Sequence, residues 1–571
     1  MQSILDRIKA IFKTKTENVT HDWLQDDVDI DERLSQLKTE TLAKDLNANL
    51  DKIKDIMGNS YDLIIRKFLI GDKELRAALV YIDGLEDARA VERIVADLTG
   101  EVIKTRVEVN KPGQALETVF SRINSNEEVI RETNLEKIFD KILIGETLVL
   151  INGVDEGIVC DTKEWQVRAV QEPESERTIR GPRDGFIESL NVNTSLVRRR
   201  IRNPNLWIEN MVIGDMTKTQ VAFAYIKGLC HEDLVNEVRS RLNKINLEDI
   251  LESGYIEEYL NDTPYTIFPL IHRTERTDIV SANILEGRVA IFTEGTPFVL
   301  IVPTRFDEML QAPDDYYELF PIGSFLRMMR HLGFLISIFL PGLYVAVINF
   351  HPELVPSTLL LRITSARQGV PFPAVVEIYI MELVFEMLRE AGLRLPGMIG
   401  PALSIVGALI LGEAAIQAGL VSPAVVIIVA MTAISSFVTP AFSLSVTGRM
   451  IRFLVVLSGA VLGLFGIQFL FLGIVIHLCS LRSFGYPYFA PIAPMIKGSW
   501  QDLFFRMPWW YQTKRPKLTG GRYPYLQTKD KEGEGKKFIP KGLEEREDPI
   551  SKNDSTRDNM SGNNKGDNKN D

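Results

Sequence analysis

Hydrophobic and polar residues are distributed differently in the two halves of the chain. Up to about Arg330 charged residues are mixed with short apolar runs, whereas long uncharged runs follow between that point and Lys497. A helix needs about 20 apolar residues to cross a hydrocarbon layer of roughly 30 Å. Four runs meet this requirement, namely Leu332 to Asn349, Leu395 to Gly412, the part of Ala414 to Gly448 that follows Ser422-Pro423, and Phe453 to Ile476. The pattern predicts a helical membrane domain over residues 327–496 with four crossings.

Between the first two runs lies a further apolar helix, Ala374 to Leu388, which three glutamates interrupt. Glu382 and Glu386 are one helical turn apart on one face, and Glu377 falls about 140° round from Glu382. Carboxylates are costly at membrane depth and normally face a cavity, a partner or an ion path. We therefore predict that these three residues, together with Glu413 in a neighbouring apolar run, are ion-pathway residues. If this helix also spans the membrane, the number of crossings rises to five.

Each of these candidates has a second interpretation. The glutamate helix is also consistent with a position in the membrane interface, where its carboxylates reach water or pair with Arg389 and Arg394. Glu413 fits an interfacial position at the end of a span equally well.

Basic residues flank the hydrophobic half on both sides. Arg327 and Arg330 precede the first run, and Lys497, Arg506, Lys514 and Arg515 follow the last one. Because positive charge is retained on the cytosolic side, both flanks are predicted to be cytosolic. Four crossings satisfy this, whereas five require that SFGYPYFAPIAP dips back into the membrane or that the C-terminus lies outside. The start, MQSILDRIKAIFKTKTEN, lacks the apolar core of a signal peptide, so the N-terminal region is expected to stay cytosolic.

The charged half contains an internal repeat. IGDKELRAALVYIDGL, from Ile70, and IGDMTKTQVAFAYIKGL, from Ile213, share an IGD, a short polar stretch, a β-rich apolar run and a glycine before leucine. ETLVLINGVDEGIVCD near Gly153 and GRVAIFTEGTPFVLIV near Gly295 form a looser pair at the same spacing of about 143 residues. Two matches in order at one offset favour a duplicated α/β unit over two independently similar segments.

A basic cluster lies between the two repeats. Its members include Arg180, Arg183, Arg198, Arg199, Arg200 and Arg202, and they are interleaved with Glu172, Glu174, Glu176, Asp184 and Glu188. Because of this interleaving we interpret the arginines as interface residues that form ion pairs between domains or subunits. The alternative is a patch that binds lipid or nucleic acid.

Composition narrows the function further. The formal net charge of −11 argues against a nucleic-acid partner. The three cysteines, Cys160, Cys230 and Cys479, lie far apart, so neither a disulfide framework nor a zinc site is indicated. The sequence has no Walker A loop, GxSxG, HExxH or GxGxxG after a strand. We therefore expect no catalytic residue, no cofactor and no metal site.

The expected fold class is α+β and membrane, with a duplicated α/β soluble N-terminal region followed by a helical transmembrane bundle. The predicted segments are a charged extension at 1–60, a first α/β subdomain at 61–171, a charged linker at 172–210, a second α/β subdomain at 211–326, the membrane domain at 327–496 with four to five spans, and a cytosolic tail at 497–571. The end of the tail is polar and rich in glycine and asparagine, which predicts disorder.

Several long motifs carry a resemblance to a known family. They read EPESERTIRGPRDGFIESLNVNTSLVRRRI, MELVFEMLREAGLRLP, VSPAVVIIVAMTAISSF, RSFGYPYFAPIAP, and RMPWW followed by KRP. From about Tyr61 to Pro516 the chain resembles the A subunits of spore germinant receptors, which are spore germination proteins of the GerA family. The first sixty residues and the long tail fall outside the resemblance.

The resemblance implies a non-enzymatic, nutrient-responsive receptor subunit embedded in the lipids of the spore inner membrane. It implies a permease-like B subunit and a lipoprotein C subunit as partners, and assembly of A subunits into a homo-oligomer that conducts monovalent cations. Two other functions remain as alternatives: a secondary transporter with the glutamate helix as a proton relay, and a membrane scaffold that recruits other subunits. The small number of spans, without an inverted repeat in hydropathy, counts against the transporter.

Overall fold

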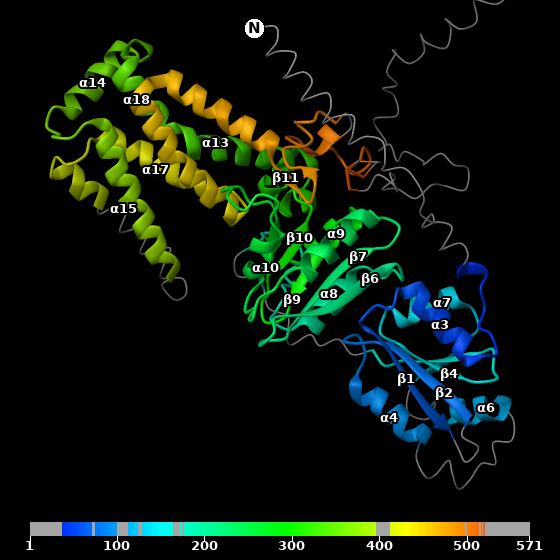
Figure 1. Ribbon diagram of the computed structural model, residues 1–571. Coiled ribbons are helices and arrows are strands. Elements are labelled where there is room, and N and C mark those ends of the chain that lie inside the picture. Colours follow the sequence, from blue (N-terminus) through cyan, green and yellow to red (C-terminus); the bar gives the residue numbers. More distant parts are fainter. Residues whose placement is uncertain are drawn as a thin grey trace, which may run out of the picture.

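The computed structural model describes residues 37–70, 75–99, 112–123, 128–163, 172–173, 176–394, 411–496, 499–512, 515–516 and 518–519. Within these ranges the chain forms two α/β subdomains in succession, and an elongated helical bundle adjoins the second one (Figure 1). The chain has mixed α and β structure, as predicted.

The first subdomain is built on a five-stranded antiparallel sheet with the order β1-β2-β4-β5-β3. Its elements are α3 (Leu46–Met57), β1 (Leu63–Ile70), β2 (Leu75–Ile82), α4 (Ala88–Thr99), α6 (Pro112–Ile123), β3 (Val129–Glu132), α7 (Leu135–Ile142), β4 (Thr147–Ile151) and β5 (Gly157–Cys160). Helices α3 and α7 pack on one face of the sheet, and α4 and α6 on the other. With both faces covered, the central strands β2 and β4 are almost entirely buried.

The second subdomain has the same order of elements. They are α8 (Leu190–Arg200), β6 (Leu206–Ile213), β7 (Thr219–Ile226), α9 (Glu232–Asn243), α10 (Ser253–Leu260), β8 (His272–Thr274), α11 (Thr277–Leu285), β9 (Val289–Thr293) and β10 (Val299–Val302). The sheet order β6-β7-β9-β10-β8 corresponds strand for strand to that of the first subdomain. The two copies of IGD begin at equivalent places, since Ile70 ends β1 and Ile213 ends β6. The internal repeat predicts this arrangement.

Two of the predicted boundaries are wrong. The charged extension was expected to last until residue 60, but α3 places Leu46, Leu50, Ile53 and Met57 in the core of the first subdomain. The charged linker was expected to last until residue 210, but α8 and the start of β6 belong to the second subdomain. In α3 the apolar residues recur every three or four positions between charged ones, so the charged face hid a core-facing stripe.

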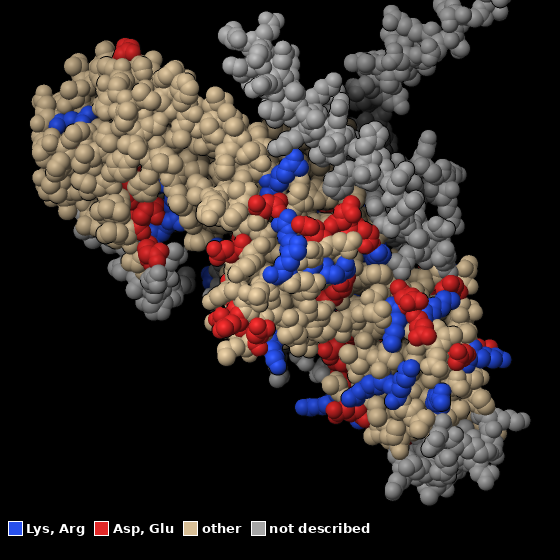
Figure 2. All heavy atoms as spheres, viewed as in Figure 1, with Lys and Arg blue, Asp and Glu red and all other residues tan. Residues whose placement is uncertain are grey.

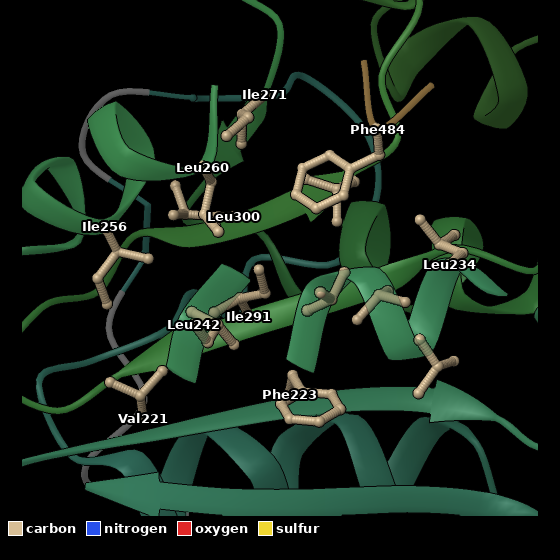
Figure 3. Close-up of a cluster of buried hydrophobic side chains, with 14 of the residues drawn as sticks. Val221, Phe223, Leu234, Leu242, Ile256, Leu260, Ile271, Ile291, Leu300 and Phe484 are labelled. Atoms are coloured by element: carbon tan, nitrogen blue, oxygen red, sulfur yellow. The ribbon is translucent and has the colours of Figure 1, made fainter. Parts of the chain in front are cut away.

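A segment from beyond the bundle completes the core of the second subdomain (Figure 3). Strands β11 (Arg482–Ser483) and β12 (Tyr486–Pro487) form a short hairpin, and Phe484 at its turn packs with Ile271 and Leu300. The Ser483 hydroxyl donates to the carbonyl of Leu270 at 2.7 Å. In this structure the first part of SFGYPYFAPIAP is therefore held against the soluble region and does not dip into the bundle.

The bundle contains α13 (Phe320–Phe350), α14 (Ser357–Arg367), α15 (Ala374–Arg394), α17 (Pro423–Phe437) and α18 (Phe442–Ser480), and the short helix α12 (Asp314–Tyr317) leads into it. Helices α13 and α18 have the length and hydropathy to cross a membrane, and α17 is a shorter apolar helix. Figure 2 shows a bundle surface that carries far fewer charged side chains than the soluble region. The predicted crossing at Leu395 to Gly412 lies almost wholly outside the described residues.

Helix α18 bends back on itself at Gly463, whose φ of 61° and ψ of −146° are not helical. The Thr447 hydroxyl donates to the carbonyl of Ile267 at 2.5 Å, and His477 Nε2 is hydrogen-bonded to the neighbouring Thr266 hydroxyl at 3.0 Å. In a straight helix Thr447 and His477 would lie about 45 Å apart. The predicted single span over 453–476 is therefore wrong, because Gly463 divides it between two antiparallel arms.

Two other limits of the predicted bundle also change. Helix α13 begins at Phe320, ahead of the predicted run from Leu332 and of the domain start at 327. On the C-terminal side, residues 499–512 pack against the start of α13, beginning with the 3-10 helix η4 (Ser499–Asp502). The ordered chain therefore extends past the predicted domain end at 496.

Candidate functional site

The glutamates of α15 lie at successive levels of the bundle interior. Glu377 and Glu382 are buried, and Glu386 is mostly buried. Helix α15 begins at Ala374, directly after Phe372-Pro373. Its 21 residues contain no proline, and no two adjacent β-branched residues occur after Val376, so the helix continues to Arg394. The carboxylates of Glu377 and Glu382 therefore do not reach bulk water. For these two residues, an interfacial position in which the carboxylates are solvated is excluded.

Glu382 and Glu386 form ion pairs with the first arm of α18. Arg452 donates through Nη1 to Glu382 at 2.5 Å, and Arg449 donates through Nη1 to Glu386 at 2.5 Å. The Glu382 side chain is only 2 % exposed. The two pairs run in opposite chain directions, so α15 and this arm of α18 are antiparallel. Arg452 also donates through Nε to the carbonyl of Ser337 on α13 at 2.7 Å, and this bond ties three helices together.

Glu377 lies at the start of α17. Its Oε2 accepts hydrogen bonds from the backbone N–H of Ser422 at 2.8 Å and from the Ser422 hydroxyl at 2.7 Å. Arg367 of α14 lies 3.3 Å from its other oxygen. A carboxylate at a helix N-terminus is stabilised by the free N–H groups and the helix dipole. Glu377 therefore joins α14, α15 and α17 at the end of the bundle far from the soluble region.

The arginines named as alternative partners behave differently. Arg389 donates to the Ser436 hydroxyl at 2.7 Å and lies over the ring of Phe437 at 4.5 Å. The side chain of Arg394 lies outside the described residues. Glu413 is exposed and accepts a hydrogen bond from Gln417 at 3.2 Å. Among the candidate carboxylates, Glu413 thus stands apart from the buried set.

One oxygen of Glu382 and one of Glu386 have no hydrogen-bond partner within the described part of the chain. Nη2 of Arg452 and Nε of Arg449 likewise have no hydrogen-bond partner among the described residues, although other nitrogens of both arginines pair with the glutamates. Unsatisfied polar atoms at this depth are expensive, so a site that keeps them is a candidate for binding or moving an ion or water. No group of three metal-ligating side chains occurs among the residues described.

Arg449 and Arg452 were not predicted. They occupy the short charged gap between the apolar runs that end at Gly448 and begin at Phe453. Their spacing of three residues matches the spacing of four between Glu382 and Glu386, since both pairs cover about one helical turn. Matching charges across the two apolar segments was the signal that could have identified them.

Within the basic cluster, Arg198 joins the two subdomains. It donates through Nε and Nη2 to both oxygens of Asp62, each at 2.9 Å, and through Nη1 to the carbonyl of Leu206. Asp62 directly precedes β1, whereas Arg198 belongs to α8. Both side chains are almost completely buried, so this is a two-pronged, charge-assisted contact inside the chain.

The other arginines of the cluster form more exposed contacts. Arg200 pairs with Asp184 at 2.6 Å, Arg183 with Glu172 at 3.1 Å, and Arg180 with Glu318 at 3.7 Å. Arg202 donates through Nε to the carbonyl of Arg199 at 3.3 Å. The Arg180 contact connects the segment before α8 to the residues just before the bundle.

A second charged network, which the sequence did not reveal, lies where the second subdomain meets α13. Arg327 donates to Asp315 at 3.0 Å and to Asp502 at 2.7 Å, and Arg330 donates to both oxygens of Asp315. Arg327 was predicted to lie on the cytosolic flank of the first span, and in the structure its side chain is completely buried. Nearby, burial raises the pKa of Glu308, yet Arg288 and Arg305 outweigh burial and hold that pKa at about 2.

Fold and site together define a class: a protein with a duplicated α/β region that is followed by an apolar helical bundle, and this bundle has membrane-spanning candidates and buried ion pairs. A family model described as "Bacillus/Clostridium GerA spore germination protein" matches residues 51–518. The chain belongs to this family, that of the A subunits of spore germinant receptors, and the resemblance seen in its motifs is confirmed.

Individual relatives agree with this family. Spore germination protein KA of Bacillus subtilis (strain 168) is 44% identical over 513 residues, which cover 88% of this chain and 92% of that protein. Spore germination protein GerLA of Bacillus cereus is 38% identical over 482 residues, which cover 84% and 95%. Among solved structures, the N-terminal domain of the A subunit of the Bacillus megaterium spore germinant receptor GerK3 is 36% identical and covers 47% of this chain and 98% of that domain, with a TM-score of 0.38.

Proposed function

We propose that this chain is a nutrient-responsive receptor subunit of the spore inner membrane that forms a homo-oligomer and contributes to a cation-conducting channel. The proposal includes a permease-like B subunit and a lipoprotein C subunit as partners, and a cytosolic soluble region. Membership of the germinant receptor A-subunit family supports the receptor role. The domain organisation supports separate roles for the two parts, since the α/β region contacts the bundle through the loop at Thr266 and Ile267 and through the hairpin at Phe484.

One observation carries the channel part of the proposal: the buried carboxylates of α15 at successive levels of an apolar bundle. Each of Glu382 and Glu386 keeps one oxygen without a protein partner in the described structure. Repetition around a closed oligomer would turn each glutamate into a ring of carboxylates, and such rings favour cations. In this arrangement the pairs with Arg452 and Arg449 neutralise the carboxylates, and conduction requires that these pairs loosen.

The test is cation conductance of the purified receptor in planar bilayers. Removing only the Glu382 charge would leave Arg452 buried and unpaired, which costs about 3–5 kcal/mol and confounds the result. Glu386→Gln, at the less buried pair, and the double variant Glu382→Gln with Arg452→Gln avoid this problem. We expect severalfold lower conductance or lost cation selectivity, at unchanged protein level and assembly.

A charge swap, Glu386→Arg with Arg449→Glu, is the matched control. It keeps the ion pair but moves the carboxylate to α18. Normal conductance and selectivity in the swap and in the glutamine variants would show that the pairs are structural only. Substrate-coupled flux without conductance would indicate a transporter, and neither activity would indicate a scaffold.

A further inference from the structure

The segment that follows the bundle, residues 499–511, returns along the first part of α13. The Ser324 hydroxyl donates to the carbonyl of Arg506 at 3.0 Å and accepts from its backbone N–H at 3.1 Å. The ring of Trp510 lies 6.1 Å from that of Phe320, and the ring of Phe504 lies 5.2 Å from that of His331. His331 is about 16 Å further along the helix than Phe320. The segment therefore runs antiparallel to α13, from the level of His331 back to the level of Phe320.

The charged groups of this segment face the protein. Asp502 accepts hydrogen bonds from Arg327 at 2.7 Å and from the Tyr316 hydroxyl at 2.6 Å. Arg506 is buried and donates to two backbone carbonyls at the start of the bundle, at 2.9 and 2.8 Å. Of the two described ionic groups of the segment, Arg506 is thus buried and Asp502 is partly exposed, and both are directed toward protein partners.

The apolar groups of the segment face outward. Its exposed large side chains are Trp500, Phe504, Phe505, Met507, Trp509 and Tyr511. The adjoining turns of α13 expose Phe320, Ile322, Phe325, Leu326 and Met328 in the same way, while Arg327 is buried. A segment in water normally shows the opposite distribution, with charges outside and aromatic rings inside.

We propose that residues 499–511, together with the first turns of α13, form an aromatic collar that lies in the headgroup and upper acyl region of the lipid bilayer. The inverted distribution of charged and apolar groups is the one that a lipid surface requires. Tryptophan and tyrosine concentrate at this depth because their rings are apolar and their N–H or O–H groups reach water. The exposed face also continues without a break into Leu332 and Leu335 of α13, which the bilayer covers in the proposed topology.

A further exposed aromatic side chain lies beside the bundle, on a loop of the second subdomain. Thr266 and Ile267, which contact the two arms of α18, lie in a loop whose Tyr265 is 97 % exposed. This loop adjoins the end of the bundle that faces the soluble region. The collar proposal rests on the membrane placement of the proposed function, but it requires neither conduction nor oligomerisation.

The test uses spin labels on the full-length chain in lipid nanodiscs, in a background without Cys160, Cys230 and Cys479. The label is attached at Phe505→Cys, a position that is 57 % exposed in the structure. Matched labels are placed at Leu457→Cys on α18, 51 % exposed, and at Ile179→Cys before α8, 95 % exposed. Oxygen dissolves in lipid and a nickel chelate stays in water, so relaxation by each reports which solvent the label contacts.

We expect the label at Phe505→Cys to be relaxed by oxygen and shielded from the nickel chelate, as at Leu457→Cys and opposite to Ile179→Cys. Relaxation by nickel, as at Ile179→Cys, would place the segment in water and overturn the collar. Shielding from both reagents would show a protein partner or a second copy on this face, and would also overturn it. Nickel accessibility at Leu457→Cys as well would overturn the membrane placement itself.

Discussion

At the residue scale, arginines are the largest fully buried side chains of the described chain: Arg198, Arg276, Arg288, Arg327 and Arg452. Each has a carboxylate partner, respectively Asp62, Asp278, Glu308, Asp315 and Glu382. A guanidinium is costly to bury alone, so loss of either partner from such a pair costs about 3–5 kcal/mol. The pairs of Arg198 with Asp62 and of Arg452 with Glu382 connect separate elements of the molecule, so each of these contacts can be tested by itself.

Asp62→Asn should weaken the joint between the two subdomains, because it leaves Arg198 buried without a carboxylate. We expect a clear fall in the melting temperature of the soluble region, equivalent to about 3–5 kcal/mol. The fluorescence of Trp207 reports this joint directly, since its indole N–H donates to the carbonyl of Ile56 across it at 3.1 Å. The control is Glu172→Gln, which removes the exposed pair with Arg183 and should change stability by at most about 0.5 kcal/mol. Equal melting of the two variants would contradict the assigned role.

At the scale of elements, the bend of α18 determines the path of the chain through the bundle. Gly463 has a positive φ, and a Cβ at this position would lie 3.0 to 3.2 Å from the side chain of Phe350. Only glycine adopts this backbone conformation readily. The bend therefore depends on one residue, whereas the two arms depend on a continuous apolar pattern.

Gly463→Ala should disrupt the hairpin of α18 and with it the contacts of Thr447 and His477. We expect the variant to yield much less monodisperse protein in detergent, because the backbone strain alone costs about 1–3 kcal/mol. Gly473→Ala is the matched control, since Gly473 lies in the second arm and a Cβ there would meet no atom within 4 Å. A normal yield and melting temperature for Gly463→Ala would show that the chain passes this point without a sharp bend.

At the scale of the whole molecule, the second subdomain and the hairpin that follows the bundle share one hydrophobic core. Phe484 and Tyr486 are part of the core that α9 and α10 cover, although more than 150 positions separate them from those helices. A fragment that ends before the bundle therefore lacks part of its own core. The first subdomain has no such dependence among its described core residues.

A fragment of residues 37–312 should fold in its first half and remain loosely packed in its second. Adding residues 481–489 through a flexible linker should raise the melting temperature and slow amide exchange in α9, because the loss of one buried phenylalanine alone costs about 3–5 kcal/mol. The added segment with Phe484→Ser serves as the control. If the fragment without the segment is equally stable and equally protected, the hairpin is dispensable for the core.

The sequence by itself determined the features that depend on local pattern. The apolar runs, the glutamate helix and the spacing of the two IGD copies are visible without a structure, because helix periodicity and repeats involve neighbouring positions or a fixed offset. The motifs were sufficient for the family. The predicted start of the first subdomain after residue 60 was nevertheless wrong, because the apolar stripe of α3 is short and the residues around it are charged.

Only the tertiary structure decided which distant residues meet. Glu382 pairs with Arg452, 70 positions away, and Arg198 with Asp62, 136 positions away. Side-chain charge shows that a buried glutamate needs a partner, but the choice of partner depends on how the helices pack. The bend at Gly463 also could not be predicted from the sequence, because glycines are frequent in apolar helices. The contacts of Thr447 and His477 with one loop show that the helix turns back at this glycine.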